Sequence, residues 1–397
     1  MLIQVFALGF TQTIAWAAST YLIAILAAPI ARDLGLSTAT VFGAFSVALV
    51  VMGLAGPAAG RAIDRFGGRG VLAVSDLVLG LGLAALGLAF NTATLFAAWC
   101  VIGLGMALGL YDAAFATLVR IHGSEARSPI TGITLIAGFA STVGWPVTAL
   151  ITEHYGWRAS CFAWAATLVF VCLPLNLVCI PKAARAKDVP AVTGHNAAAS
   201  GAPHRAAGEY RRAFALLVIF GATTSFVTSA MAAHLPGLLL AVGTSAVAAL
   251  AASALLGPAQ VAARLTEFLA ARRFRFHPLL TARIATAFHP VAGTVLAIGG
   301  GPAVIASLFA VLHGAGNGMI TIAKGTLPLA IFGPVGYGHR QGLLSMLGRG
   351  MQALAPFAFG VVLERYGPRW ALGLSVTLSL IALASLMALR QSAAQKG

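Results

Sequence analysis

Only a few side chains can do chemistry inside the long apolar stretches of this chain. Asp112 and Lys324 each lie within such a stretch, and Arg264 lies in another, one helical turn after Gln260. An ionisable side chain at membrane depth is costly, so each of these residues is a functional candidate. A guanidinium can hold a carboxylate through two parallel hydrogen bonds, and a carboxamide four residues earlier shares its helix face. Arg264 and Gln260 therefore predict a site for an organic anion.

The sequence gives no sign of other reaction chemistry. The acidic, histidine and cysteine residues are too scattered to predict a metal site, and the four cysteines have no disulfide or metal-ligand spacing. The chain contains neither a G-x-x-x-x-G-K-[ST] phosphate loop nor a G-x-S-x-G element, which disfavours ATP-driven transport and nucleophilic catalysis. We therefore expect no enzyme activity and no resident cofactor.

Membrane-spanning helices must position these side chains. Hydrophobic residues make up 59% of the 397 residues, and a soluble domain of this size could not hide so much apolar surface. The predicted fold class is an all-α membrane protein with twelve transmembrane helices in two pseudo-symmetric six-helix bundles. Apolar runs of about 20 residues place these spans at 8–31, 38–60, 70–90, 93–118, 129–152, 157–180, 213–238, 246–270, 279–299, 303–328, 341–363 and 369–389. The first run lacks the basic region and the cleavage site of a removable signal peptide.

The positive charges predict the orientation of the chain. Seventeen of the 25 Lys and Arg residues fall in loops or tails on one side of the predicted membrane, whereas the opposite loops hold only Arg32, Arg158, Arg365 and Arg369. The positive-inside rule makes the first side cytosolic, so both termini should be cytosolic and the membrane should be the cell inner (plasma) membrane. The net charge of +15 then needs no nucleic acid. We expect a monomer whose partners are a small-molecule substrate, protons and the lipid bilayer.

The two halves of the chain repeat each other. A Gly-x-Gly pair at 103–105 and a Glu-x-Tyr-Gly-x-Arg element at 153–158 recur 211 residues later, at 314–316 and 364–369. Parallel repeats of this kind build transporters with a substrate site at the interface of the two halves. We therefore expect two bundles of six helices joined by a linker.

The expected domains are an N-terminal bundle at 1–180, a cytosolic linker at 181–212 and a C-terminal bundle at 213–397. The repeat offset pairs Lys324 with Ala113, the neighbour of Asp112. We predict that Asp112 and Lys324 approach each other as a gate between the halves. The alternative is that each charge is neutralised by a partner within its own half.

A charged turn between the second and third predicted spans, Gly60-Arg-Ala-Ile-Asp64-Arg65-Phe-Gly67-Gly68-Arg69, resembles the corresponding loop of major facilitator superfamily transporters. The resemblance covers nearly the whole chain and implies a secondary transporter that works by rocker-switch alternating access. It implies a gating role for Gly60, Asp64, Arg65 and Arg69. Asp64 should pair with basic or helix-end groups, and Arg65 and Arg69 should brace the local network; the alternative is surface anchoring alone.

Helices seven and eight resemble the monocarboxylate and oxalate/formate porter branch of that superfamily. The resemblance lies in the pattern Gln260-x-x-x-Arg264 and in His234 with its neighbours at 231–236, although Gln stands where the branch has Asn. It implies that Arg264 and Gln260 bind a substrate carboxylate and that His234 and Tyr111 line the cavity. The alternative for His234 is a residue of the membrane interface.

The resemblance implies proton-coupled transport of a small organic anion such as a monocarboxylate. Asp112 is the leading candidate for the proton-coupling group, and His234 or the substrate itself is the alternative. Asn317 and Arg349, near the middle of the tenth and eleventh predicted spans, are further substrate-binding candidates. Asn317 would otherwise satisfy backbone groups.

Three other charged residues, Asp76, Glu267 and Arg283, lie near the predicted cytosolic helix ends. Snorkelling makes a charge tolerable there, so we expect these residues to support loop networks rather than the substrate.

Two other functions stay open. A drug or lipophilic-compound exporter of the same superfamily would need an apolar, aromatic-lined cavity, for which the candidates are Trp16, Tyr21, Phe42, Phe45 and Phe226. A receptor-like protein on a transporter scaffold is a third reading, which no sequence feature favours.

Overall fold

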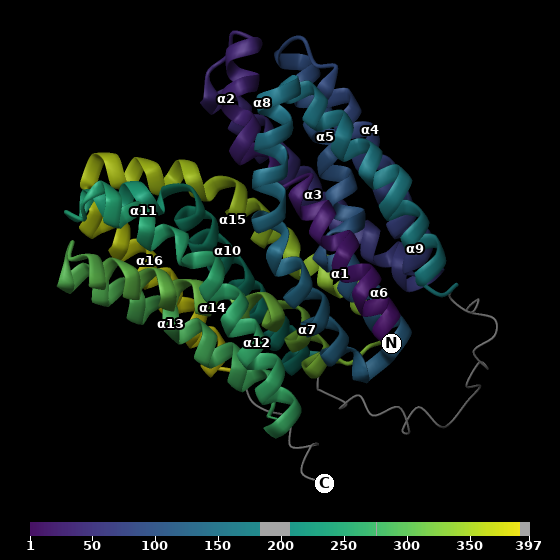
Figure 1. Cartoon of the computed structure of the whole chain (residues 1–397). Coiled ribbons are helices and arrows are strands. Elements are labelled where there is room, and N and C mark those ends of the chain that lie inside the picture. Colours follow the sequence, from purple (N-terminus) through teal and green to yellow (C-terminus); the bar gives the residue numbers. More distant parts are fainter. Residues whose placement is uncertain (183–206, 275, 390–397) are drawn as a thin grey trace. The chain divides into compact units, whose positions relative to one another are not determined.

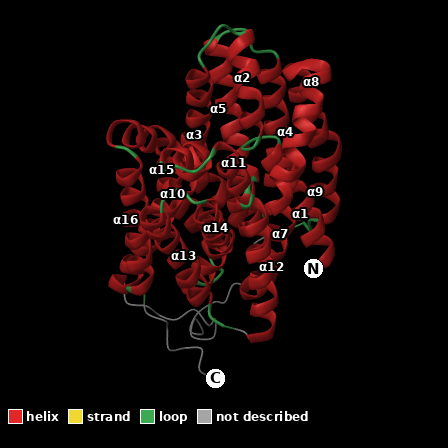
Figure 2. Ribbon diagram, turned by 60° about the vertical axis from the view of Figure 1, so that its left-hand side comes forward, coloured by secondary structure: helices red, strands yellow, loops and turns green. Residues whose placement is uncertain are grey.

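The computed structural model describes residues 1–182, 207–274 and 276–389, which are almost entirely helical (Figure 1). No strand occurs among these residues (Figure 2), so the predicted all-α fold class is confirmed. The helices form two compact units. The first contains residues 1–203 and 332–346, and the second contains residues 204–331 and 347–397.

The N-terminal part of the chain supplies most of the first unit. Its α-helices in the described residues are α1 (Leu2–Ala17), α2 (Leu22–Asp33), α3 (Thr38–Phe66), α4 (Gly68–Gly87), α5 (Thr92–Gly109), α6 (Tyr111–His122), α7 (Arg127–Ile136), α8 (Ala140–Thr167) and α9 (Leu173–Cys179). Two short 3₁₀ turns, η1 (Gly123–Ala126) and η2 (Ala137–Phe139), and a π-helical turn, η3 (Leu168–Cys172), lie between them. Helix α5 packs against both α3 and α4.

The second unit is built from longer helices. They are α10 (Ala207–Ala241), α11 (Ala246–Ala254), α12 (Leu256–Phe274), α13 (Pro278–Gly299), α14 (Ala303–Phe332), α15 (Tyr337–Tyr366) and α16 (Pro368–Met387). The first turns of α15, up to Met346, belong to the first unit. Helix α16 packs against α10 and α13.

The helix lengths fit the predicted spans. In the described residues, ten helical stretches are long and apolar enough to cross a membrane. One of them, Thr92–Cys179, has 88 residues, and a single helix of that length would measure about 130 Å against a hydrocarbon core of ~30 Å. The turn η1 and a break at Gly156 divide this stretch into three. The result is consistent with twelve spans.

Several predicted boundaries differ from the observed ones. The first span is not one helix but α1 and α2, and the fourth and eighth spans are each interrupted, at Leu110 and Leu255. Helix α10 begins at Ala207, inside the predicted linker. The remainder of that linker, 183–206, lies outside the described residues. Pro258, in the first turn of α12, has no N–H for the carbonyl of Ala254, which accounts for the interruption at Leu255. No Pro marks the other two interruptions, so the sequence gave no reason to expect them.

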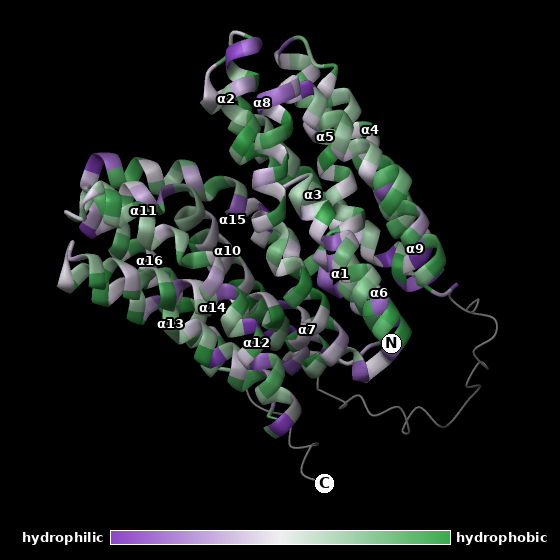
Figure 3. Cartoon of the chain, viewed as in Figure 1, coloured by the Kyte–Doolittle hydropathy of each residue, from purple (hydrophilic) through white to green (hydrophobic). Residues whose placement is uncertain are grey.

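Large apolar side chains cover the outward faces of many helices. Leu54, Leu81, Phe170 and Ile298 are all more than two-thirds exposed, and apolar residues run along the length of the helices in Figure 3. In water such surfaces would drive aggregation, whereas lipid tails solvate them. The same helices satisfy their backbone groups internally, as a bilayer requires.

The repeated glycines perform the same packing task in both units. A Cβ atom on Gly103 would meet the backbone of Ala48 on α3, and one on Gly314 would lie 2.7 Å from the carbonyl oxygen of Leu256 on α12. Glycine is therefore what lets the fourth span contact the second, and the tenth contact the eighth, backbone to backbone.

The second repeated element makes equivalent turns. Gly156 and Gly367 have φ of +83° and +86°, in the left-handed region that favours glycine. Each turn joins a long helix to the next span. The sequence repeat therefore reflects repeated backbone geometry within each unit.

We predict that Gly314→Ala destabilises the protein. The added Cβ would lie 2.7 Å from the Leu256 oxygen and 3.0 Å from Ala259 Cβ, and overpacking of this kind costs about 1–3 kcal/mol. Thermal unfolding of the purified protein in detergent measures the change. Gly373→Ala on α16 is the matched control, because nothing lies within 4 Å of its added Cβ. Equal melting temperatures for the two variants would contradict the role assigned to Gly314.

Candidate functional site

The candidate residues from the sequence lie in both units. Tyr111, Asp112 and the charged turn of Gly60, Asp64, Arg65 and Arg69 belong to the first. Gln260, Arg264, His234, Asn317, Lys324 and Arg349 belong to the second.

The fourth span is broken where two of its candidates lie. Helix α5 ends at Gly109, Leu110 is extended (ψ −170°), and α6 starts at Tyr111. The break leaves the Gly109 carbonyl without its helical partner, and the side chain of Gln12 on α1 donates a hydrogen bond to it (2.6 Å). Buried backbone groups must find such partners in a membrane. Gln12, which is 2% exposed, therefore stabilises the break.

Tyr111 and Asp112 form the first turn of α6. The ring of Tyr111 packs against Trp16 (centroids 4.9 Å apart) and stacks on Phe115 (5.3 Å). Asp112 Oδ1 accepts hydrogen bonds from Gln341 Nε2 and Ser345 Oγ, both at 3.0 Å. A carboxylate in the first turn also interacts favourably with the positive end of the helix dipole.

Asp64 caps the start of α15. Its two carboxylate oxygens accept hydrogen bonds from the backbone N–H groups of Gly338 (2.9 Å) and His339 (2.8 Å). These N–H groups belong to the first turn of α15, whose amides have no partner within the helix. The negative charge also complements the helix dipole. Asp64 thus contacts a helix end, and its gating role stays a prediction.

Close backbone contact brings Asp64 to that helix end. Gly60 on α3 and Gly338 on α15 touch, and a Cβ on either residue would collide with the backbone of the other helix. The guanidinium of Arg65 lies over the Phe66 ring (5.0 Å) and is exposed. Arg69 is half-buried at the start of α4. The bracing role expected for these two arginines stays a prediction.

In the second unit, Arg264 is buried beside Gln260. Its side chain is 5% exposed; Nε donates to the Gly318 carbonyl (3.3 Å), and Nη2 lies 3.5 Å from Gln260 Oε1. Gly318 allows this arrangement, because its Cβ would lie 2.5 Å from the backbone oxygen of Gln260. The predicted pairing of guanidinium and carboxamide on one helix face is thus present in α12.

Helix α14 directs two candidates toward α10. Lys324 Nζ donates to Ser225 Oγ (2.9 Å), and Asn317 Oδ1 accepts from Thr228 Oγ1 (3.0 Å). Both contacts stay within the second unit. They give each side chain a hydrogen-bond partner in its own half, a neutral hydroxyl group in both cases, and the roles predicted for Lys324 and Asn317 stay predictions.

The other two candidates, His234 on α10 and Arg349 on α15, both form hydrogen bonds with residues of α15. His234 Nε2 donates to the carbonyl oxygen of Pro356 (2.7 Å), and Arg349 Nη1 donates to Gln352 Oε1 (2.9 Å). Pro356 has no N–H for the carbonyl of Gln352, which instead accepts from Ser229 Oγ (2.8 Å). His234 therefore helps to hold a proline-containing stretch of α15.

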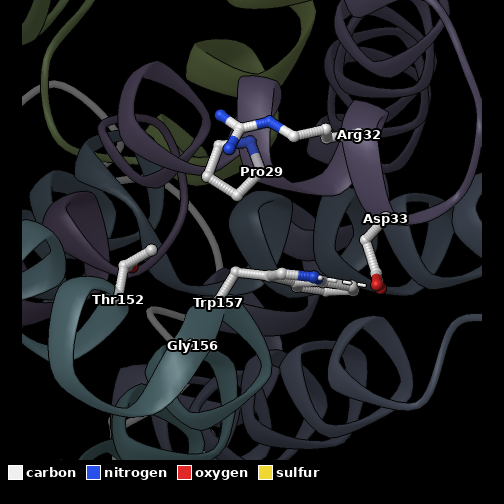
Figure 4. A pocket seen from close by; sticks show the side chains of 6 residues that line it. All are labelled: Pro29, Arg32, Asp33, Thr152, Gly156 and Trp157. Atoms are coloured by element: carbon white, nitrogen blue, oxygen red, sulfur yellow. Dashed lines mark hydrogen bonds between the residues drawn. The ribbon is translucent and has the colours of Figure 1, made fainter.

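A hollow of about 460 Å³ in the first unit lies among α2 and α8 (Figure 4). Figure 4 shows Arg32 and Trp157 on its walls, with the Trp157 Nε1–H bonded to Asp33 Oδ2 (3.2 Å). Asp33 also forms an ion pair with Arg158, whose Nη2 donates to the Ala89 carbonyl (2.9 Å). Arg158, the arginine of the repeated element, therefore links the end of α2 to the residues that follow α4. We assign this hollow a structural role.

Sequence reasoning missed the partners of two buried polar groups, Asp76 and the histidine pair of His289 and His313. Asp76, expected near a loop network, is 4% exposed and bonds to Asn176. His289 and His313 stack in the second unit with ring centroids 4.3 Å apart, and both are 2% exposed. An Asp or His in an apolar run was a visible signal, but its partner on another helix was not. Within the described residues, no three His, Cys, Asp or Glu side chains cluster as metal ligands.

Comparisons with known proteins give one family. The model of the family described as the Major Facilitator Superfamily matches residues 8–356. The chain is also 29% identical over 154 residues to an uncharacterized 38 kDa protein in the 23S RNA operon of Thermoproteus tenax. That match spans 39% of this chain and only 40% of the relative.

Three solved structures share the fold. The human organic anion transporter MFSD10 (TETRAN) has a TM-score of 0.74 at 15% identity, covering 97% of this chain and 99% of that one. The proton:xylose symporter XylE scores 0.71 at 14% identity, over 96% and 94%. The E. coli fucose:proton symporter FucP scores 0.65 at 16% identity, over 98% of both chains.

We predict that Asp64→Asn loosens the start of α15. Hydrogen bonds to a charged group are worth about 1.5–3 kcal/mol, so amide exchange at Gly338 and His339 should become about tenfold to a hundredfold faster. Hydrogen-exchange mass spectrometry of the peptide that contains both amides measures this. The exposed Glu364→Gln at the other end of α15 is the control. Unchanged protection in Asp64→Asn would show that the carboxylate does not hold this helix end.

Proposed function

Because the chain belongs to the major facilitator superfamily, we propose that this multi-pass membrane transporter moves a small organic anion, a monocarboxylate, together with a proton. It works by alternating access between two six-helix bundles. We place it in the cell inner membrane as a monomer with both termini in the cytosol, on the distribution of Lys and Arg in its loops.

The observation that carries the anion assignment is Arg264. A guanidinium that is 5% exposed, within a membrane-spanning helix, is held there at a substantial energetic cost. Its Nε is fixed by the Gly318 carbonyl, and its Nη2 lies at the long distance of 3.5 Å from Gln260. A guanidinium oriented in this way suits a carboxylate, with which it can form two parallel hydrogen bonds. Gln260 would take a neighbouring hydroxyl or keto oxygen.

The other candidate residues complete this proposal. Tyr111, His234 and Asn317 would line the cavity, and Arg349 would be a second anion ligand. Asp112, or alternatively His234, would carry the proton. A similar protein, MFSD10, is described as an organic anion transporter, but at 15% identity it supports the fold rather than the cargo.

The gate is proposed from two sets of residues. Asp112 and Lys324 would exchange their present hydroxyl and amide partners, Ser345, Gln341 and Ser225, for each other. Asp64, with Gly60, Arg65 and Arg69, would hold α15 in one state and release it in the other.

An exporter of lipophilic compounds is the second candidate. Its support is an aromatic cluster in the first unit, where Tyr21 lies 6.2 Å from Trp16 and 5.9 Å from Trp145. Phe226, however, is 4% exposed and packs in the apolar core of the second unit. Phe226 is therefore not available to line the aromatic cavity that an exporter would need.

We predict that lactate raises the melting temperature of the purified protein, because a ligand that binds the native state stabilises it. Arg264→Lys should weaken this binding about tenfold to a hundredfold, since a lysine cannot form the two parallel bonds of a guanidinium, each worth about 1.5–3 kcal/mol to a charged group. A thermal-shift titration with lactate measures both proteins.

The matched control is Arg283→Lys. Arg283 is a guanidinium in the same unit, but it donates to the backbone carbonyls of Leu386 and Leu389. The lactate-induced shift should survive in this variant even if its baseline stability falls. Normal lactate affinity in Arg264→Lys would contradict the proposal that Arg264 binds the carboxylate. Stabilisation of the protein by tetraphenylphosphonium instead of lactate would favour the exporter.

A further inference from the structure

Asp76 is a buried carboxyl group to which no function has been assigned above. It lies on α4, eight residues after the helix begins at Gly68, which is about 12 Å along the helix at 1.5 Å per residue. The side chain is 4% exposed, and Oδ2 accepts a hydrogen bond from Asn176 Nδ2 at 2.8 Å. Asn176 is itself 2% exposed, on α9.

Among the residues that the structure describes, the surroundings of Asp76 provide amide and hydroxyl groups but no cation. Thr11 on α1 lies 3.4 Å from Asn176 Oδ1 and extends the network to a third helix. The buried thiol of Cys172, on η3, is the titratable group that faces Asp76. The π-helical turn η3 is itself an irregularity of the kind that often marks functional sites.

The charged groups on the other helices packed against α4 are exposed or have partners elsewhere. Arg65, Arg120 and Glu153 are exposed, and Arg61 Nη1 lies 3.2 Å from His339 Nδ1. Asp64 of α3 bonds to the start of α15, Asp112 of α6 bonds to Gln341 and Ser345, and Arg158 of α8 pairs with Asp33. Helix α5 contains no charged residue. Within the described residues, no Lys or Arg therefore pairs with Asp76.

A carboxylate in this position is expensive. Burying an ionised carboxyl group without a cation costs far more than burying its neutral form, and one amide donor offsets only part of that cost. Uptake of a proton removes the charge, and its release restores it. The site therefore responds to protonation with a large change in local electrostatic energy.

The same site is connected to the break in the fourth span. Ser75, the neighbour of Asp76, donates to the Gly105 carbonyl (2.9 Å) and lies against Gly109. Gln12, the neighbour of Thr11, donates to the Gly109 carbonyl (2.6 Å). The last turns of α5, directly before the break, are thus held by the two chain segments that surround Asp76.

We propose that Asp76 is a proton-binding site of this transporter, and that its protonation is transmitted through Asn176, Thr11 and Ser75 to the helix break before Tyr111. This inference rests on the proposed proton coupling, and adds a proton site in α4 to the candidate Asp112. A purely structural Asp76–Asn176 hydrogen bond would make the same contact but would not exchange a proton.

Infrared difference spectroscopy of the purified protein during a pH titration tests the site without any substrate. A carboxyl band that appears and disappears with pH should be present in the wild type, lost in Asp76→Asn and retained in the exposed control Glu153→Gln. Asn176→Leu should shift the frequency of that band, because it removes the amide donor, and this variant decides the question if Asp76→Asn does not fold. Identical spectra for wild type and Asp76→Asn, or for wild type and Asn176→Leu in that case, would overturn the proposal.

Proteoliposomes test the coupling. Asp76→Asn should lose the accumulation of labelled lactate that a proton gradient drives, while it retains the exchange of internal for external lactate. Accumulation at the wild-type level in this variant would overturn the coupling role. If wild-type vesicles carry no lactate, the proposed cargo fails, and the infrared titration still decides whether Asp76 binds a proton.

Discussion

A polar group inside a bilayer must find its partner within the protein, and the structure of this transporter follows from that constraint. The carbonyl of Gly109, freed where the fourth span breaks, accepts from Gln12. The carbonyl of Gln352, which Pro356 leaves without its helical donor, accepts from Ser229. In both cases the irregularity in a helix is matched by a side chain on another helix. The positions of the polar side chains in these bundles are fixed by such needs before any substrate binds.

The same constraint separates structural polar groups from functional ones. A hydroxyl or amide that bonds to a backbone carbonyl is accounted for by the fold. A buried charge without an opposite charge is not, because one neutral partner offsets only part of its desolvation. Asp76 in the first unit stands out in this way, and we propose it as a proton acceptor. Arg264 in the second unit is a deeply buried guanidinium, which we propose as the cation for an anionic cargo. Transport of an acid with a proton needs both kinds of site.

Much of the fold could be predicted from the sequence, because apolar runs and repeated glycines depend on local chemistry. The apolar runs predicted the helices, and the turn at Gly60–Arg69 predicted the superfamily. The repeated Gly103 and Gly314 indicated a close helix contact, which each unit contains. The break at Leu110 was not foreseen, since no Pro marks it and glycines such as Gly109 are also common in continuous membrane helices. The partner of Asp76 was also hidden, because periodicity does not fix the rotation of an all-apolar helix, and Asn176 lies 100 residues away.

The central claim is that this protein moves a small organic anion together with a proton. Wild-type proteoliposomes that contain a pH-sensitive dye, given labelled lactate outside and an inward proton gradient, test it most directly. The account predicts that lactate accumulates above its external concentration, that internal acidification follows it beyond the rate in protein-free vesicles, and that a protonophore abolishes the accumulation. Lactate uptake no faster than in protein-free vesicles, or uptake that a protonophore leaves unchanged, would contradict it.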